Sequence, residues 1–144
     1  MTYIAEEYKP IYKEILTVLQ KKYNYMTEIC RLTEEMEKSL QRDDRISTQM
    51  LISMRQEEIE GIQQCDRELD LYVDSLPQTL QEWMKDALKG TELQSEECGM
   101  EDNLVLKLSA NIRSAWEKTI RIDKHVNQKL AGEDSFYYES KNRE

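Results

Sequence analysis

Asp43 and Asp44 are adjacent, and they are the residues whose types and spacing most suggest chemistry in this sequence. Two carboxylates can share a proton or a metal ion when both point into one site. Neighbouring residues of a helix point about 100° apart, so a pair inside one helix cannot do this. An aspartate just before a helix instead accepts a hydrogen bond from a free backbone N–H. We therefore predict a turn and an N-cap here, with one continuous helix as the alternative.

The rest of the chain offers few groups for catalysis or metal binding. His125 is the one histidine, and no glutamate lies three residues before it, as di-iron helical bundles require. The HExxH motif and the glycine-rich phosphate-binding motifs are absent as well. A Ser/His/Asp or Cys/His site stays open, because its members meet only in the folded chain. His125 is nevertheless expected at the surface of a charged helix, and we predict no enzyme, no metal site and no cofactor.

The three cysteines, Cys30, Cys65 and Cys98, lie far apart and form no CxxC pair. An odd and sparse set of this kind indicates neither a disulfide framework nor a zinc site. Cys30 and Cys65 lie on or beside apolar stripes, so we predict that they are buried thiols.

The composition favours long helices with one buried stripe. The chain of 144 residues is 39% apolar and 34% charged, and it has only four glycines and two prolines, which disfavours a turn-rich β fold. Its net charge of −9 argues against binding to nucleic acid or to an anionic membrane surface. No apolar run is long enough for membrane insertion and no signal peptide is evident, so we expect a cytoplasmic protein.

Apolar residues recur at helical spacing on both sides of the aspartates. The first period predicts a helix over residues 9–41, with Pro10 in its first turn, where the missing N–H costs nothing. The second predicts another long helix and hence an antiparallel hairpin. Glu58 and Gly61 interrupt it, which predicts a bend or a polar layer at residues 56–61. This second stripe consists of Ile46, Met50, Met54, Ile62, Cys65, Leu69, Tyr72, Val73 and Leu76.

Pro77 separates this helix from a short amphipathic one, predicted over Pro77–Lys89. Ser75 is its expected N-cap and Gly90 its expected end. The large side chains here and in the last helix are predicted mainly as core, with binding anchors as the alternative; they are Trp83, Met84 and Trp116. Four methionines are predicted to give a pliable surface that fits several partners: Met26, Met36, Met50 and Met54.

The end of the chain is predicted as an acidic loop over residues 91–102 and a last helix, capped by Asp102 or Asn103 and closed by Gly132. The predicted fold is all-α, an elongated antiparallel helical hairpin or bundle of three long helices plus one short helix. We expect a single helical domain over residues 1–132 and a polar C-terminal tail over residues 133–144.

The stretch LQRDDRISTQMLISMRQEEIEGIQQCDREL, which follows the first long helix, resembles the hairpin of the FlgN-type flagellar export chaperones. The last helix resembles the C-terminal helix of the same family, with an asparagine near its end and a tyrosine in the tail. The residues that carry the resemblance are Leu40, Asp43, Leu51, Arg55, Ile59, Asn127, Leu130 and Tyr137 or Tyr138.

The resemblance implies a cytoplasmic chaperone that binds amphipathic helical ends of hook–filament junction proteins before type III secretion into the bacterial flagellum. The last helix carries a wide apolar stripe behind the acidic loop, so we predict that it binds the client. The predicted client-binding residues are Leu104, Leu108, Ile112, Ala115, Trp116, Ile122, Val126 and Leu130. The alternative is a self-associating structural coiled-coil or bundle protein with no client, and the sequence leaves open whether the chain forms a homodimer.

Overall fold

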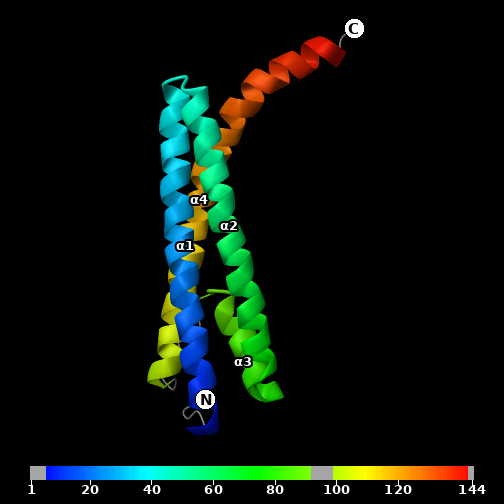
Figure 1. The fold of residues 1–144 in the computed structure, drawn as a ribbon. Helices are drawn as coiled ribbons and strands as arrows, with labels where there is room; N and C mark the ends of the chain where they lie inside the picture. The colour runs from blue at the N-terminus through cyan, green and yellow to red at the C-terminus, as the bar shows by residue number, and fades with distance from the viewer. Residues whose placement is uncertain (1–5, 92–98, 143–144) are drawn as a thin grey trace.

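The computed structural model describes residues 6–91 and 99–142, with side chains as far as Leu130, and these residues are helical without a strand. A short 3-10 helix, Glu6–Tyr8, leads into α1. Three long helices and a short one follow, which confirms the predicted all-α fold (Figure 1). They are α1 (Lys9–Gln41), α2 (Arg45–Asp74), α3 (Gln78–Leu88) and α4 (Met100–Asn142).

Helix α1 is the central helix of the bundle. It packs along α2 on one side and along α4 on the other, whereas α2 and α4 do not approach each other closely through their backbones. The short α3 touches both α2 and α4 and fills part of the space between them. Figure 1 shows α1 and α2 as an antiparallel hairpin, with α4 running beside α1 in the same direction. The predicted bounds of the first helix and the position of Pro10 in its first turn are confirmed.

The hairpin turn uses the two aspartates in different ways, as a turn residue and an N-cap. Asp43 has a left-handed backbone with φ of 54°. Its N–H donates to the Leu40 carbonyl at 3.1 Å, and the Asp44 N–H donates to the Ser39 carbonyl at 2.8 Å. This is the hydrogen-bond pattern that ends many helices, with aspartate where glycine is usual. The Asp44 carboxylate then accepts from the Ser47 N–H at 3.0 Å and from the Ser47 hydroxyl at 2.6 Å, which begins α2.

The two ends of the bundle differ in the number of helices that surround the core. At the four-helix end, α3 joins α1, α2 and α4 around a large buried cluster. At the three-helix end, beside the hairpin turn, the described residues form a smaller buried cluster of Met36, Leu40 and Val126, against which half-buried side chains of α2 and α4 pack. The larger cluster consists of Tyr12, Ile15, Val18, Leu19, Cys65, Leu69, Val73, Leu76, Leu80, Met84, Ala87, Val105 and Ile112.

The predicted interruption at residues 56–61 does not break α2, which runs continuously from Arg45 to Asp74. Gly61 lies under the ring of Tyr25 from α1, and a Cβ atom at this position would stand 2.6 Å from the Tyr25 Cε1 atom. The glycine therefore gives an aromatic ring of α1 room to lie on the backbone of α2. The cost of glycine in a helix is only about 1 kcal/mol, so close packing can outweigh it.

Three predicted helix boundaries were wrong. Ser75 ends α2 rather than capping α3, because its N–H donates back to the Tyr72 carbonyl at 3.1 Å. The N-cap of α3 is Pro77. Helix α4 begins at Met100, before the predicted caps, and runs past Gly132 to Asn142. Glycine weakens a helix without stopping it, so the helix continues. The prediction for Gly90 is confirmed by its φ of 75° just after α3.

The predicted acidic loop and tail are described only in part. Residues 92–98 of the loop and 143–144 of the tail lie outside the described residues. Residues 133–142 continue α4, and Figure 1 shows this last stretch leaving the α1–α2 hairpin. The division into a domain over residues 1–132 and a tail over 133–144 stays a prediction.

Candidate helix-binding surface

The face that α4 turns toward the hairpin is half polar. Its buried residues follow each other at steps of three, four or seven, as expected for one helix face. They are Asp102, Val105, Ser109, Ile112, Thr119 and Val126. A seam in which every second residue is polar gains less from burial than an apolar one, because hydrophobic stabilisation follows buried apolar area. Helix α4 therefore packs on α1 while some of its large apolar side chains remain outside this contact.

The eight predicted client-binding residues divide between the two faces of α4. Ile112 and Val126 are buried in the seam. Leu104 and Trp116 are 44% and 50% exposed. The other four are partly buried: Leu108, Ala115, Ile122 and Leu130. The predicted stripe is therefore neither fully buried nor fully free.

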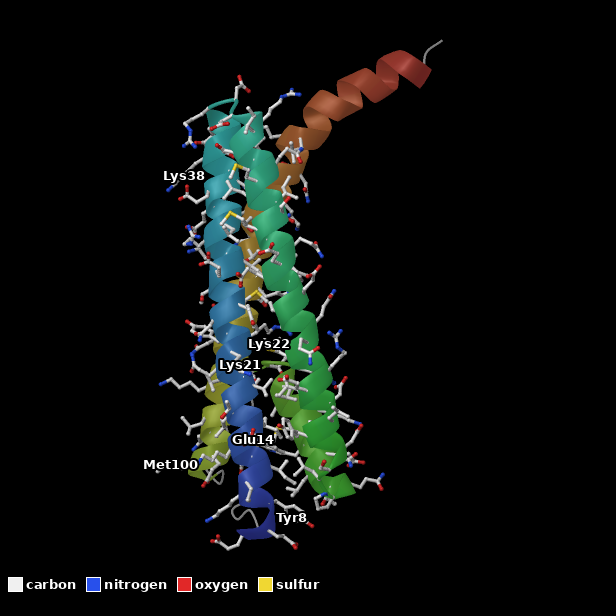
Figure 2. All side chains as sticks on the ribbon, in the orientation of Figure 1. Tyr8, Glu14, Lys21, Lys22, Lys38 and Met100 are labelled. Carbon is white, nitrogen blue, oxygen red and sulfur yellow. The ribbon has the colours of Figure 1, made fainter. Side chains whose placement is uncertain are left out.

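The outward leucines of α4 lie in a groove beside α1. Leu104 and Leu108 face Leu16, and the three side chains line a shallow depression of about 480 Å³. The rest of its lining is polar or basic and comes from α1: Lys13, Thr17, Gln20, Lys21 and Asn24. Figure 2 labels Lys21 on α1 and Met100 at the start of α4. We call these eight residues the α1–α4 groove. The groove contains an apolar strip of three leucines, flanked by five polar or basic side chains, and its lining has no carboxylate.

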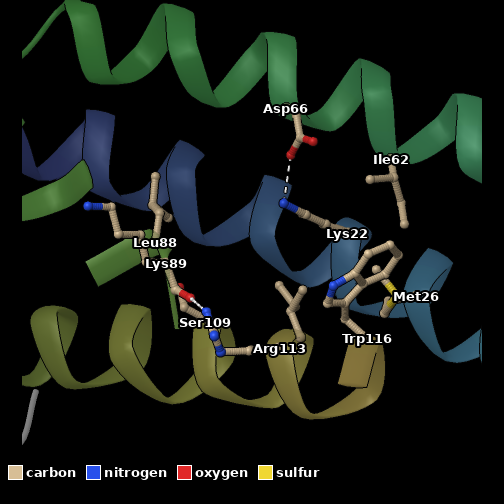
Figure 3. A pocket seen from close by; sticks show the side chains of 10 residues that line it. Lys22, Met26, Ile62, Asp66, Leu88, Lys89, Ser109, Arg113 and Trp116 are labelled. Atoms are coloured by element: carbon tan, nitrogen blue, oxygen red, sulfur yellow. Dashed lines mark hydrogen bonds and ion pairs between the residues drawn. The ribbon is translucent and has the colours of Figure 1, made fainter. Parts of the chain in front are cut away.

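A second cavity lies where α3 ends, between the four-helix and three-helix ends. It measures about 290 Å³ and has walls from all four helices. Trp116 of α4 borders it beside Met26 and Ile62 (Figure 3). An ion pair joins α1 and α2 in its wall, since the Lys22 Nζ atom lies 2.6 Å from Asp66 Oδ1. Trp116 was predicted mainly as core, and it is instead half exposed at this opening.

An exposed apolar stripe lies on α2 at the three-helix end. Ile46, Met50 and Met54, which the second period placed on one apolar stripe with the core residues that follow, are 78%, 61% and 44% exposed. Helix α2 instead buries Thr48 here and half-buries Leu51 and Ile52, because those positions face its neighbours. Of the four methionines predicted on a pliable surface, Met50 and Met54 are exposed, whereas Met26 and Met36 are buried and cannot belong to it.

Ion pairs hold α4 to the hairpin at the three-helix end. Arg55 of α2 reaches Asp123 of α4 with 2.7 Å between Nη1 and Oδ1, and it also donates to the Thr33 hydroxyl of α1 at 3.2 Å. Lys118 of α4 pairs with Glu34 of α1 at 2.9 Å. The Lys118 ammonium lowers the pKa of the Glu34 carboxyl below its ordinary value. These contacts were not foreseen, because partners on three different helices share no sequence spacing.

A buried carboxyl lies at the start of α4. Asp102, predicted as a cap, is the third residue of the helix and is fully buried, as is Tyr12 of α1. Burial raises the pKa of Asp102 above its ordinary value, although the Gly99 N–H and the Tyr12 hydroxyl favour the charged form and oppose this.

The described residues bring together little catalytic chemistry. No group of three His, Cys, Asp or Glu residues among them could hold a metal ion. His125 is exposed on α4, as predicted. Cys30 and Cys65 are the predicted buried free thiols, and Cys98 lies outside the described residues. In the same part of the chain, no helix has the length and apolar character needed to cross a bilayer.

Comparison with known proteins adds no relative. No protein-family model, no curated protein and no solved structure matches the chain.

Proposed function

We propose that this protein binds amphipathic helices at the ends of other proteins, as a cytoplasmic export chaperone for flagellar hook–filament junction proteins. The observation that supports it is the α1–α4 groove, in which Leu16, Leu104 and Leu108 form an accessible apolar strip between two long helices. An amphipathic helix laid into such a groove buries its apolar face, which is a recurrent mode of peptide recognition.

The strip is short enough for reversible binding. Fully burying a leucine contributes about 1.5–3 kcal/mol, and Leu104 is already about half buried. Three such side chains give only a modest gain once the cost of immobilising a client is subtracted. A chaperone that must release its client before secretion needs an affinity of this kind.

The half-polar seam of α4 also supports the proposal. Because Asp102, Ser109 and Thr119 occupy buried positions, α4 docks on α1 while Leu104 stays 44% exposed and Leu108 stays only partly buried in the lining of the groove. A helix that used all its apolar residues for its own docking would leave no surface for a client.

The alternative is self-association into a structural bundle without a client. One observation favours it, the second apolar stripe of Ile46, Met50 and Met54 on α2. Exposed apolar residues in a row can pack against the same row of a second copy.

The test is the affinity of the full chain for synthetic peptides with the C-terminal helices of hook–filament junction proteins, measured by fluorescence anisotropy. Leu104→Asp with Leu108→Asp should weaken binding at least about tenfold, because two charges would enter the apolar strip. Point substitutions are preferable to deletion of residues 103–144, which would also remove the packing of α4 on α1.

The matched control is Leu71→Asp, an exposed leucine of α2 that is 69% accessible and not part of the groove. It should bind the peptides as the unchanged protein does. If the groove double variant binds as well as this control, the site is wrong. Light scattering separates the alternative, since a stable homodimer that takes up no peptide would favour the structural bundle.

A further inference from the structure

We propose that the client helix carries carboxylates along one flank of its apolar stripe and pairs them with Lys13 and Lys21 of α1. This inference rests on the proposed binding of a helix in the α1–α4 groove. It specifies the chemistry of the partner, an amphipathic helix with an acidic flank, which the apolar strip alone does not.

The groove differs in charge from the rest of the chain. The protein has 29 acidic and 20 basic residues and a net charge of −9. The lining of the groove nevertheless contains two lysines and no carboxylate. The groove is positively charged, whereas the net charge of the whole protein is negative. Such a groove selects partners by charge, because unlike charges attract and like charges repel across an interface.

Among the residues that the structure describes, the two lysines form no ion pair, unlike three other lysines of α1. Lys9 pairs with Glu6, Lys22 with Asp66 and Lys38 with Glu35. Within residues 6–91 and 99–130, no carboxylate oxygen lies within 4.0 Å of the Lys13 or Lys21 ammonium group. Both side chains are exposed, so their ammonium groups are accessible to carboxylates of a partner.

Two acidic residues that lie within one helical turn of groove residues have other contacts. Glu14 follows Lys13 in sequence but accepts a hydrogen bond from the Tyr72 hydroxyl of α2 at 3.4 Å. Glu101 lies one helical turn before Leu104 and interacts with Lys9 beyond the end of the groove. Neither belongs to the lining, so neither neutralises the lysines there.

The spacing of the lysines predicts the spacing of the acids in the partner. Lys13 and Lys21 are eight residues apart, which is about 12 Å along a helix at 1.5 Å per residue. A partner helix beside α1 can match this distance with carboxylates seven or eight residues apart, which share one face. Its leucines would then lie over the strip formed by Leu16, Leu104 and Leu108.

The probes are two synthetic amphipathic peptides of about 18 residues, or five turns. They share one leucine stripe and differ only in the flank, which carries either glutamates or lysines at the predicted spacing. Anisotropy with the full chain should show the glutamate peptide binding about tenfold more tightly at low salt. The difference should shrink as salt is added, because exposed charges are screened.

The decisive variant is Lys13→Glu with Lys21→Glu. It should lose the preference for the glutamate peptide and bind the lysine peptide more tightly than the unchanged protein does. This gain shows that the variant is folded. The matched control, Lys85→Glu with Lys124→Glu, reverses two exposed lysines outside the groove and should keep the original preference.

The outcomes separate this inference from the proposed function. If both peptides bind equally and the lysine reversal changes nothing, while Leu104→Asp with Leu108→Asp removes binding, the inference on charge is wrong and the groove stands. If neither peptide binds, the inference on charge and the proposed binding of a helix in the groove are both wrong. A dimer that the lysine reversal dissociates would overturn the inference, because a second copy would then occupy the groove.

Discussion

The four-helix and three-helix ends of the bundle share α1 but are stabilised differently. At the four-helix end, α3 fills the space between α2 and α4, and the core is large and apolar. At the three-helix end, the buried apolar cluster is Met36, Leu40 and Val126, and α1 also buries Ile29, Cys30 and Leu32 nearby. Polar contacts supplement it, including the buried hydroxyls of Ser39 and Thr48, 2.5 Å apart. The end that has the additional helix of eleven residues therefore has the larger apolar cluster, and the other end has the smaller one.

The difference between the two ends determines which of them unfolds locally at lower free energy. Net stabilisation by a hydrogen bond is about 1 kcal/mol, less than that of a buried large apolar side chain. Regions with fewer buried apolar contacts unfold locally at lower free energy than the rest. We expect the three-helix end to open before the four-helix end, and five predictions test this contrast.

The largest expected effect comes from two buried methionines, one at each end. Met84 and Met36 are 0% and 1% exposed. Met84→Ala should lower the free energy of unfolding by about 4 kcal/mol, because four helices hold the cavity open. Met36→Ala should cost about 2 kcal/mol, because half-buried neighbours at the thinner end can move into the space. Denaturant unfolding gives both values, and equal losses would contradict the contrast between the ends.

The Arg55–Asp123 ion pair comes next, because it joins α2 and α4 where their backbones do not touch. Its side chains are 18% and 31% exposed, so the pair is only partly screened by solvent. Arg55→Met should cost about 1–2 kcal/mol, between the values for surface and buried pairs. Lys89→Met, which breaks the exposed pair with Asp86, is the control and should cost under about 0.5 kcal/mol. A similar cost for both would mean that the bridge does not hold the three-helix end.

Asp102 should give the four-helix end a distinctive pH dependence. Its folded pKa is raised above the ordinary 3.8, so the folded state binds its proton more tightly than the unfolded state does. The contribution of protonated Asp102 to folding stability is fully present below the pKa of Asp102 in the unfolded chain. It is lost as the pH rises through the pKa of Asp102 in the folded protein. The advantage of Asp102→Asn over the unchanged protein should therefore grow from pH 4 upward. Urea unfolding of both proteins across pH checks this, and a constant difference would contradict it.

The turn at the three-helix end should respond in opposite directions to changes at its two aspartates. Asp43→Gly should stabilise by about 0.5–1 kcal/mol, because glycine adopts a positive φ without strain. Asp44→Ala should lower the midpoint of thermal unfolding, because it removes the hydrogen bonds to Ser47.

These bonds also hold the pKa of Asp44 below its ordinary value. The stabilising contribution of Asp44 is therefore present above the unfolded pKa and is lost as the pH falls through the folded pKa. A loss of stability in Asp43→Gly would contradict the turn role of Asp43, and an unchanged midpoint in Asp44→Ala would contradict the cap.

The smallest effect is expected from the exposed α2 stripe. Ile46→Gln or Met50→Gln should change the free energy of unfolding by less than about 0.5 kcal/mol, since both side chains already face solvent. Measurement at several protein concentrations serves as the control. A loss above about 1 kcal/mol that grows with concentration would mean that a second copy covers the stripe.

Local features were predictable because their physical causes lie within a few residues. Asp44 caps α2 through Ser47, three positions later, and Pro10 is tolerated in a first turn whatever surrounds it. Ser75 shows the limit of such reasoning, since a serine near a proline can end one helix as readily as begin another.

The candidate site was only partly predictable. Helical periodicity located Leu104 and Leu108 on an apolar stripe of the last helix, but it could not separate them from the buried Ile112 and Val126. Leu16, Lys13 and Lys21 were missed, because their relation to α4 exists only in the folded chain. The absence of carboxylates among exposed positions 13, 17, 20, 21 and 24 was the one signal available in the sequence.

The sequence by itself determined the helices and the hairpin turn, because propensity, capping and periodicity act over a few residues. Tertiary structure decided which side of each helix is covered. The stripe from Ile46 to Met54 is exposed because none of the described side chains covers it, and Gly61 is tolerated because Tyr25 packs on it. A period of 3.6 residues shows that a helix has an apolar face, but the number and position of its neighbours decide whether that face is core or binding surface.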